Sequence, residues 1–498
     1  MLAVEMLEQQ IHFIALLFLL LEMAGIYSAF HAILNTRTSQ AAIAWAISLI
    51  IIPLFILPLY WIFGNRRFHG YMASFRRARL ANITTAYKAL RQIEAYHVST
   101  IDGLKDIILT VKKLQHLPFT SHNSVQLLIN GQETYQAMLS AIDQADDYVL
   151  LQFYIIQDDH VGVAFRNKLI AKIQQGVRVY FLYDSLGSYF LSARYLYELR
   201  RAGAHVSSFN ERKGISKYLH INFRNHRKIL IIDGLKAFVG GLNLGQEYLG
   251  EKQSMGYWRD THVLLEGPSV QVCQSVFVKD WYWSVGKIPE LNWQVQTAAA
   301  MCREKNMADS DEQIHCEQEI MILDTGPADE KPVCSLFICA LVNQAKSRLW
   351  IASPYFVPDA EIINALKNAA LRGVDVRLIL PEKYDKYFIY LTSFAYYREL
   401  QGYNIKIFRY TKGFSHQKVI LVDDNLAAVG TVNLDNRSIH LNFEIMAYVA
   451  GAHFNRQVAN MLEYDMKNCF EDNIDDFARK PFWFKAVSRV FYLLSPIL

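Results

Sequence analysis

The chain contains the stretch HRKILIID at residues 226–233 and returns to the same pattern with HQKVILVD at residues 416–423. Each copy reads H-x-K-x4-D, and each leads into a turn of small residues. The turns end at Asn243 and Asn433, in both cases ten residues after the motif Asp. One such match would be weak evidence. Two matches with the same trailing turn indicate a duplicated functional unit.

The spacing of the motif suggests its chemistry. In an extended strand alternate side chains share a face, so the His and Lys of each copy point the same way. The four aliphatic residues that follow are typical of a strand buried on both faces. Two such pairs, brought together, provide one imidazole to attack a phosphorus atom and another to protonate the leaving group. Lysines and asparagines would stabilise the phosphate oxygens. The candidate residues are His226, Lys228, Asn243, His416, Lys418 and Asn433. A lone His near a strand end is usually a core residue, but the duplication favours a shared active site.

The first part of the 498-residue chain predicts a membrane anchor. Residues 11–34 are mostly apolar, and residues 41–63 carry no charge. Each stretch exceeds the roughly 20 residues needed to cross a bilayer. Neither is followed by a cleavage pattern of small residues. We therefore expect a two-helix transmembrane hairpin within residues 1–64, the alternative being two buried core helices.

Basic residues predict the orientation of this hairpin. The connection between the two stretches carries only Arg37, whereas five arginines come soon after the second stretch, and no acid occurs until Glu94. They are Arg66, Arg67, Arg76, Arg77 and Arg79. The positive-inside rule places both the N-terminus and the large C-terminal part in the cytoplasm, which predicts a multi-pass membrane protein. The same arginines would attract anionic headgroups, and a plain topology signal explains them equally well.

From about residue 124 the pattern alternates between strands and helices, which is typical of an α/β domain. A similar series returns 190–199 residues later, so the repeat is a whole domain. The expected organisation is a basic helical connector at 65–121, a first domain at 122–295, a linker at 296–317, a second domain at 318–479 and an amphipathic helix at 480–498. That last helix suits a membrane interface and packing on the protein's own core equally well.

The sequence predicts no cofactor and no metal. Its six cysteines form no C-x-x-C pair, and their spacing suggests neither disulfides nor zinc. No P-loop and no dinucleotide-binding glycine pattern is present. The lysines would supply the positive charge that a metal provides elsewhere.

The two octets with their Asn turns are the signature of the phospholipase D superfamily, and further segments resemble bacterial cardiolipin synthases. These segments are PLYWIFG at 58–64, Tyr154, WRDTH at 258–262, SPYFVP at 353–358, NLDNRS at 433–438, NFE at 442–444 and LSPIL at 494–498. The resemblance covers essentially the whole chain; one departure is Gly241, where the superfamily often has Ser. It implies an α/β fold of two tandem phospholipase D-like domains, each a mixed sheet flanked by helices, related by a pseudo-two-fold axis and following the transmembrane hairpin.

The resemblance also implies a reaction. Such enzymes join two phosphatidylglycerol molecules into cardiolipin and release glycerol. By analogy His226 would form a phosphatidyl-histidine intermediate and His416 would act as acid and then base, although sequence alone does not separate the two. Asp260 and Glu444 resemble the acids that orient the imidazoles. Asp233 and Asp423 belong to the motif and are expected in the catalytic set, with bracing of the fold as the alternative.

Three other functions remain open at this stage. A phospholipase D-type hydrolase or another phosphatidyltransferase would use the same residues. A membrane-anchored nuclease is disfavoured because the basic residues cluster beside the apolar stretches and not around the motifs. A non-catalytic scaffold would not need two complete octets. The expected partners are phosphatidylglycerol and cardiolipin in the membrane, with no nucleic acid and no obligatory protein partner.

Overall fold

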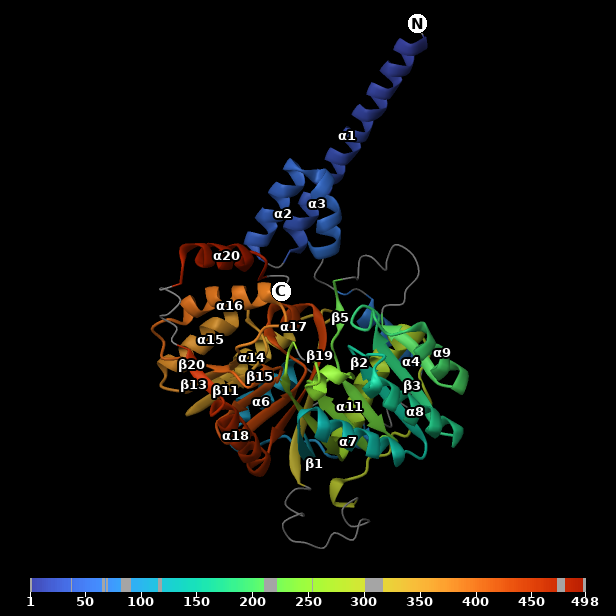
Figure 1. Cartoon of the computed structure of the whole chain (residues 1–498), viewed down its shortest axis with the longest axis vertical. Helices are drawn as coiled ribbons and strands as arrows, with labels where there is room; N and C mark the ends of the chain where they lie inside the picture. Colours follow the sequence, from blue (N-terminus) through green and yellow to red (C-terminus); the bar gives the residue numbers. More distant parts are fainter. Residues whose placement is uncertain are drawn as a thin grey trace. The chain divides into compact units, whose positions relative to one another are not determined.

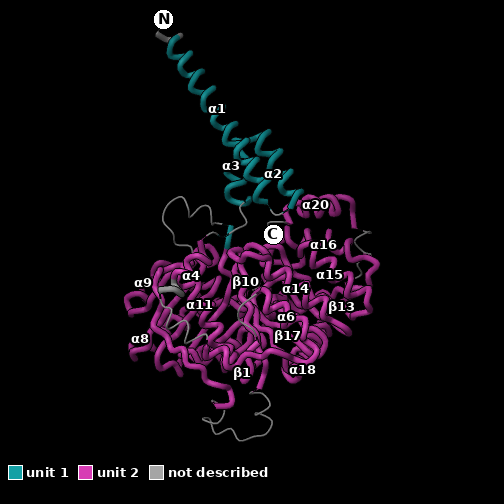
Figure 2. The backbone as a smooth tube through the Cα atoms, turned by 180° about the vertical axis from the view of Figure 1, so that it is seen from behind, with its two compact units in different colours: residues 1–69, 212–223 teal, residues 70–211, 224–498 magenta. Residues whose placement is uncertain are grey.

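The computed structural model describes residues 2–36, 38–64, 68, 70–81, 91–114, 119–209, 222–252, 254–300, 317–472 and 480–495. Arg37, Arg66, Arg67, most of the predicted linker and the last three residues lie outside these ranges. The chain forms two compact units, residues 1–69 with 212–223, and residues 70–211 with 224–498 (Figure 2). Both repeats therefore belong to the same unit.

The first unit contains α1 (Leu2–Asn35), α2 (Ser39–Ile51), α3 (Pro53–Leu59) and a π-helical turn (Tyr60–Gly64). Within the described residues, one helix is long and apolar enough to cross a membrane, over Glu5–Asn35. Its large apolar side chains are mostly exposed, with Phe13 at 67% and Phe18 at 62%. Such exposure fits a lipid environment far better than water.

The prediction of a second continuous helix over 41–63 is wrong. Helix α2 ends at Ile51, and Ile52 leaves the helical region with φ −137° and ψ 61°. The cause is Pro53, which has no backbone N–H to donate and disfavours helical backbone in the residue before it. Proline is well tolerated at the first position of the next helix, where α3 begins. The apolar segment is thus two short helices, and a simple two-helix hairpin is not observed.

In the second unit, sixteen described strands form one mixed sheet. Its centre is the antiparallel pair β1 (Thr120–Ile129) and β10 (Gln318–Thr325). Outward from β1 the first half of the chain contributes β9 (Thr261–Glu266), β7 (Lys236–Gly240), β6 (Ile229–Ile232), β2 (Tyr148–Phe153), β3 (Arg178–Asp184) and β4 (His205–Phe209).

The second half repeats this order outward from β10. Its strands are β19 (Asn442–Ala450), β17 (Leu426–Gly430), β16 (Val419–Val422), β11 (Arg348–Ala352), β13 (Asp375–Pro381), β14 (Lys406–Tyr410) and the edge strand β20 (Cys469–Asp472). The motif strands β6 and β16 occupy equivalent positions. The predicted α/β fold with two phospholipase D-like halves is confirmed, and the repeated order gives the pseudo-two-fold relation.

Helices cover both faces of the sheet (Figure 1). On one face, α11 (Pro268–Val285) and α18 (Ala452–Met466) share a single core with strands of both halves. On the other, α7 (Asn130–Asp143), α8 (His160–Gln174) and α9 (Ala193–Ala202) pack on the first half. Helices α14 (Val333–Gln344), α15 (Ala360–Leu371) and α16 (Tyr387–Leu400) do the same on the second.

The predicted C-terminal helix is α20 (Phe482–Tyr492), and it packs on α16. Phe484 contacts Phe394 with ring centroids 5.2 Å apart, and the Tyr492 hydroxyl donates a hydrogen bond to Glu399 at 3.0 Å. Packing on the protein's own core is therefore confirmed for one face of the helix. Its opposite face leaves Phe482 85% exposed and Trp483 59% exposed.

Candidate active site

Each motif histidine follows a short strand that pairs with the other half of the chain. Strand β5 (Arg224–Asn225) lies parallel to the start of β19, and β15 (Gly413–Ser415) lies parallel to β8 (Tyr257–Arg259). The backbone N–H of His226 then donates to the carbonyl of Phe443 at 2.9 Å, and that of His416 to the carbonyl of Arg259 at 2.7 Å. The two halves thus exchange the segments that deliver their histidines.

The strand that carries the first motif differs in one detail from the expectation. The His and Lys of each motif were expected to lie in one extended strand with the four aliphatic residues, but the sheet strand β6 begins only at Ile229. His226 and Lys228 lie in the connection between β5 and β6. Both motifs are therefore held at the end of a buried strand by pairing on two sides, which fixes the imidazoles without placing them inside the sheet.

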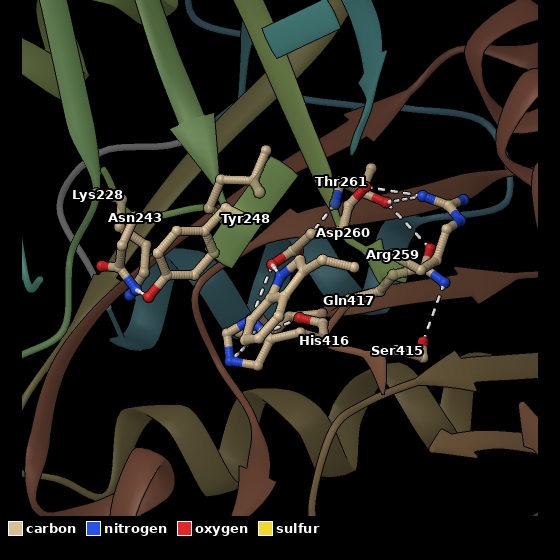
Figure 3. Close-up of polar contacts among 12 residues, drawn as sticks. Lys228, Asn243, Tyr248, Arg259, Asp260, Thr261, Ser415, His416 and Gln417 are labelled. Carbon is tan, nitrogen blue, oxygen red and sulfur yellow. Dashed lines mark hydrogen bonds and ion pairs between the residues drawn. The ribbon is translucent and has the colours of Figure 1, made fainter. Parts of the chain in front are cut away.

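The acids that orient the imidazoles come from the opposite halves. Nδ1 of His226 donates to the Glu444 carboxylate at 2.9 Å. Nδ1 of His416 donates to Asp260 at 2.8 Å (Figure 3). Both carboxylates are fully buried. A carboxylate on Nδ1 fixes the tautomer in which Nε2 has the free lone pair. Glu444 and Asp260 thus lie where the sequence expected the orienting acids.

Burial keeps both imidazoles neutral. It lowers the pKa of His226 to about 4 and that of His416 to about 4, despite the raising effect of their carboxylate partners. Burial also lowers the pKa of Lys228 to about 7 and that of Lys418 to about 8. Repulsion from Lys418 contributes to the lowered pKa of Lys228. The two motifs therefore lie close enough to share one electrostatic environment, in which a bound anion would favour the charged form of both lysines.

The two histidines differ in what approaches Nε2. The Lys418 ammonium lies beside the His416 ring, 2.9 Å from Nδ1 and 3.1 Å from Nε2. Among the described residues, none makes a hydrogen bond to Nε2 of His226. The Lys228 ammonium instead donates to the His226 carbonyl at 2.6 Å and lies over the ring of Tyr154, 5.5 Å from its centroid. The lone pair of His226 is the more available for attack.

The two motif asparagines are not equivalent either. The side-chain oxygen of Asn243 accepts from the backbone N–H of Ile155 at 3.0 Å, and its amide donates to the Tyr248 hydroxyl at 2.9 Å (Figure 3). The side-chain oxygen of Asn433 is buried and has no hydrogen-bond partner among the described residues. Asn433 is 5% exposed, and its buried side-chain oxygen is still available to accept a hydrogen bond.

The motif aspartates lie at the other end of the motif strand. The Asp233 carboxylate accepts the backbone N–H groups of Asp146, Asp147 and Tyr148 at 2.7–2.9 Å. Asp423 accepts those of residues 346–348 at 2.8–3.2 Å in the equivalent turn. Four strand residues separate each Asp from the histidine end, more than 10 Å at roughly 3.3 Å per residue. The geometry favours the bracing alternative over the predicted direct role at the phosphate.

Comparison with known proteins agrees with this architecture. The profile of the family described as "Cardiolipin synthase, PLD-like domain" matches residues 138–281 and 338–466, one segment in each half. Cardiolipin synthase A of Pseudomonas aeruginosa is 39% identical over 494 residues, 98% of this chain and 96% of its own. Cardiolipin synthase A of Pseudomonas putida is 39% identical over 495 residues, 98% of each. The chain belongs to the cardiolipin synthase family. It is thereby an enzyme of the phospholipase D superfamily.

Among solved structures, phosphatidylserine synthase from Haemophilus influenzae Rd KW20 has the same fold. It matches with a TM-score of 0.58 and 14% identity, covering 79% of this chain and all of its own. The whole of that protein is matched and about a fifth of this chain is not. The fold that the two proteins share therefore accounts for only part of this chain.

Sequence reasoning missed the ion pairs that hold the two motifs against the shared helical core. Arg227, the variable residue of the first motif, is 1% exposed and bonds Asp280 of α11 at 2.7 Å. In the second motif Gln417 donates to Asp465 of α18 at 3.0 Å, and Arg259 supplies the charge with two bonds of 2.8 Å to the same acid. The available signal was an acid on the buried face of each helix, at a position that should otherwise be hydrophobic.

Proposed function

We propose that this enzyme makes cardiolipin by transferring a phosphatidyl group from one phosphatidylglycerol to another and releasing glycerol. The observation that carries the proposal is the pair of histidines, each oriented through Nδ1 by a buried acid of the other half. Such a site is complete only when both halves contribute. Membership of the cardiolipin synthase family supports the choice of substrate.

In the first step, Nε2 of His226 attacks the phosphorus of the donor lipid. The P–N bond forms, the P–O bond to the headgroup glycerol breaks, and His416 gives its proton to the departing oxygen. The neutral state of His226 suits a nucleophile. His416 must be protonated at this step, and a bound phosphate beside Lys418 favours the imidazolium by its negative charge.

In the second step, His416 accepts the proton of a glycerol hydroxyl on the second phosphatidylglycerol. That oxygen attacks phosphorus, the P–N bond breaks, and cardiolipin is formed. Lys228, Lys418 and Asn433 would stabilise the charge on the phosphate oxygens. Asn243, whose amide is held by Tyr248, would contribute mainly by fixing the turn. Water must be kept from the intermediate, which the burial of both motifs favours.

We also propose the finer organisation of the chain. The catalytic domains are residues 122–295 and 318–479, joined by the linker 296–317 and preceded by the connector 65–121. The apolar residues 1–64 anchor the enzyme in the bacterial inner membrane as a multi-pass segment, formed by α1 and the broken pair α2–α3. The catalytic domains face the cytoplasm, which is supported by the arginines that follow the apolar segment.

The test uses the purified full-length enzyme in detergent micelles with radiolabelled phosphatidylglycerol as the only lipid. Wild type is compared with His226→Ala and His416→Ala, and with His160→Ala as an exposed control on α8. Wild type and the control should form cardiolipin and glycerol, whereas both motif variants should lose this activity. Because the P–N bond of a phosphohistidine hydrolyses in acid, the reactions are quenched with alkaline SDS. His416→Ala should then retain phosphate label on the protein, since the second step lacks its base, and His226→Ala should not.

The products decide between the alternatives. Phosphatidic acid in place of cardiolipin would identify a phospholipase D-type hydrolase. Label retained by His226→Ala and absent from His416→Ala would exchange the roles of the two histidines. No turnover of any lipid would overturn the proposal and direct attention to other phosphodiesters.

A further inference from the structure

A cavity opens beside the second motif, between β13, β14 and α16. It is a narrow cavity that opens to the surface. Three basic residues line it, Lys383, Lys386 and Arg409, together with one acid, Asp385. That acid is engaged, because its carboxylate accepts the Tyr355 hydroxyl at 2.5 Å. Arg409 is paired with Asp472 at 3.0 Å, so the two lysines supply the positive charge that favours an anion in the cavity.

Arg409 forms the floor of this cavity. It is only 2% exposed, and the rings of Tyr390, Phe394 and Tyr397 surround its guanidinium at 5.0–5.5 Å. Its Nε donates to Asp472 at 3.0 Å and Nη1 to the carbonyl of Pro381 at 3.1 Å. Nη2 is buried and has no partner among the described residues. A buried guanidinium nitrogen left without an acceptor is costly, and an anionic oxygen would satisfy it.

The cavity is connected to the active site through a shared wall. Phe414 lines the cavity and contacts the imidazole of His416, with ring centroids 5.8 Å apart. His416 is the residue proposed to activate the acceptor hydroxyl. A group held in the cavity would thus lie beside the incoming lipid and not at the reacting phosphorus, which lies between the two lysines of the motifs.

Within the described residues, the first half of the chain has no counterpart of this site. Strand pairing places Leu380 opposite Arg409, and Tyr183 opposite Ser208 in the equivalent strands of the first half. The position of Arg409 is therefore a serine in the other repeat. Phe414, two residues before His416, is likewise replaced by Arg224 two residues before His226. Because the strand order is otherwise repeated, this difference gives the second half a cavity lining that the first half lacks.

We propose that this cavity binds the phosphate of the acceptor phosphatidylglycerol, with Arg409, Lys383 and Lys386 as its ligands. The inference rests on the proposed function, and it explains how one site holds two phosphodiesters. The donor phosphate reacts between the motifs. The acceptor phosphate is an unreacting anion, separated from the attacking hydroxyl by a three-carbon glycerol unit.

Two reactions of the same enzyme test this assignment. Cardiolipin formation requires an acceptor with its own phosphate. Exchange of labelled free glycerol into phosphatidylglycerol uses the same donor step with an acceptor that has none. Arg409→Met and Lys386→Gln are compared with Arg398→Gln, an exposed arginine of α16 outside the cavity. We expect Arg409→Met to lower cardiolipin formation about ten- to a hundredfold, as for loss of a charge-assisted hydrogen bond, with glycerol exchange unchanged within about twofold.

Lys386→Gln should shift the ratio of the two reactions in the same direction by a smaller factor, and Arg398→Gln should leave it unchanged. The exposed variants Lys383→Gln and Lys386→Gln carry the test if Arg409→Met fails to fold. An equal loss of both reactions in these lysine variants, or an unchanged ratio, overturns the proposal. A wild type that exchanges glycerol but forms no cardiolipin would instead refute the proposed function.

Inorganic phosphate distinguishes a lipid phosphate from a free anion. If the cavity takes the acceptor headgroup, phosphate should inhibit cardiolipin formation competitively with phosphatidylglycerol, spare glycerol exchange, and lose potency in Lys386→Gln. Inhibition that added phosphatidylglycerol does not relieve would assign the cavity to a free anion and overturn the acceptor assignment.

Discussion

His416 in the second half of the chain donates a hydrogen bond from Nδ1 to Asp260 in the first half at 2.8 Å. Its counterpart His226, in the first half, donates a hydrogen bond from Nδ1 to Glu444 in the second half. Neither half contains a motif histidine together with the acid that orients it. This exchange makes the active site a property of the assembled pair, and it links correct folding of both halves directly to activity.

The first prediction concerns these acids. Asp260→Asn and Glu444→Gln keep the shape of the side chain but remove the charge that fixes the imidazole tautomer. We expect each to lower kcat for cardiolipin formation by about 10²- to 10⁴-fold, the range seen when a catalytic His loses its orienting acid. Circular dichroism should show an unchanged fold. Glu463→Gln, on the exposed face of α18, is the control, and a similar loss there would indicate a general effect of charge.

A second prediction follows from the glycine where the superfamily often has Ser. A Cβ atom at Gly241 would lie 2.0 Å from Oδ1 of Asp260, far closer than any real contact. Gly241→Ala must therefore displace the carboxylate that holds His416. We expect activity to fall at least about tenfold, equivalent to about 1.4 kcal/mol in the barrier. Thr431→Ser, at the equivalent position of the other half, should leave the activity nearly unchanged. Full activity of Gly241→Ala would mean that Asp260 can move without cost.

Much of this architecture could be predicted from the sequence because it is encoded locally. The alternation of strands and helices expected from about residue 124 is present in both halves, as where α14 (Val333–Gln344) follows β10. The exchange of acids could not be predicted. It depends on β5 and β15, strands of two and three residues that have no periodic signal and exist only by pairing with the other half. Pro53 is a signal of a helix break in the sequence, but the long apolar stretch around it favoured a single spanning helix.

The third prediction separates bracing from catalysis at the motif aspartates. Asp233→Asn and Asp423→Asn each weaken several hydrogen bonds from backbone N–H groups in a turn. We expect the free energy of unfolding to fall by about 1–3 kcal/mol, with kcat of the folded enzyme within about threefold of wild type. Asp424→Asn is a matched control, because this neighbour is 87% exposed. A large loss of kcat with unchanged stability would restore a direct role at the phosphate.

The fourth prediction concerns the buried ion pair behind the first motif. Asp280→Asn would leave the Arg227 guanidinium with a weaker partner in a fully buried position, although Asp324 remains at 3.2 Å. The Tyr71 hydroxyl, which donates to Asp280 at 2.5 Å, would also be affected. We expect a loss of about 3 kcal/mol of stability, as for other broken buried pairs. The double variant Asp280→Asn, Arg227→Gln should recover part of it, and thermal melts would measure the difference. No recovery would indicate that Arg227 serves another purpose.

The last prediction is acid sensitivity caused by the neutral buried histidines. The pKa values of His226 and His416 are lowered to about 4, whereas an unfolded chain has histidines near 6.5. Between these values the unfolded state binds more protons, so stability must fall as the pH falls from 6.5 to about 4. Each histidine contributes at most about 1.4 kcal/mol per pH unit in this window. Asp260 and Glu444, whose pKa values are lowered by their cationic neighbours against the effect of burial, remain charged through most of it. Melting temperatures measured from pH 7 to 5 should therefore decline less steeply in His416→Gln than in wild type. The exposed control His160→Gln should show the same decline as wild type. Identical slopes in all three proteins would mean that these imidazoles accept protons in the folded state as readily as in water.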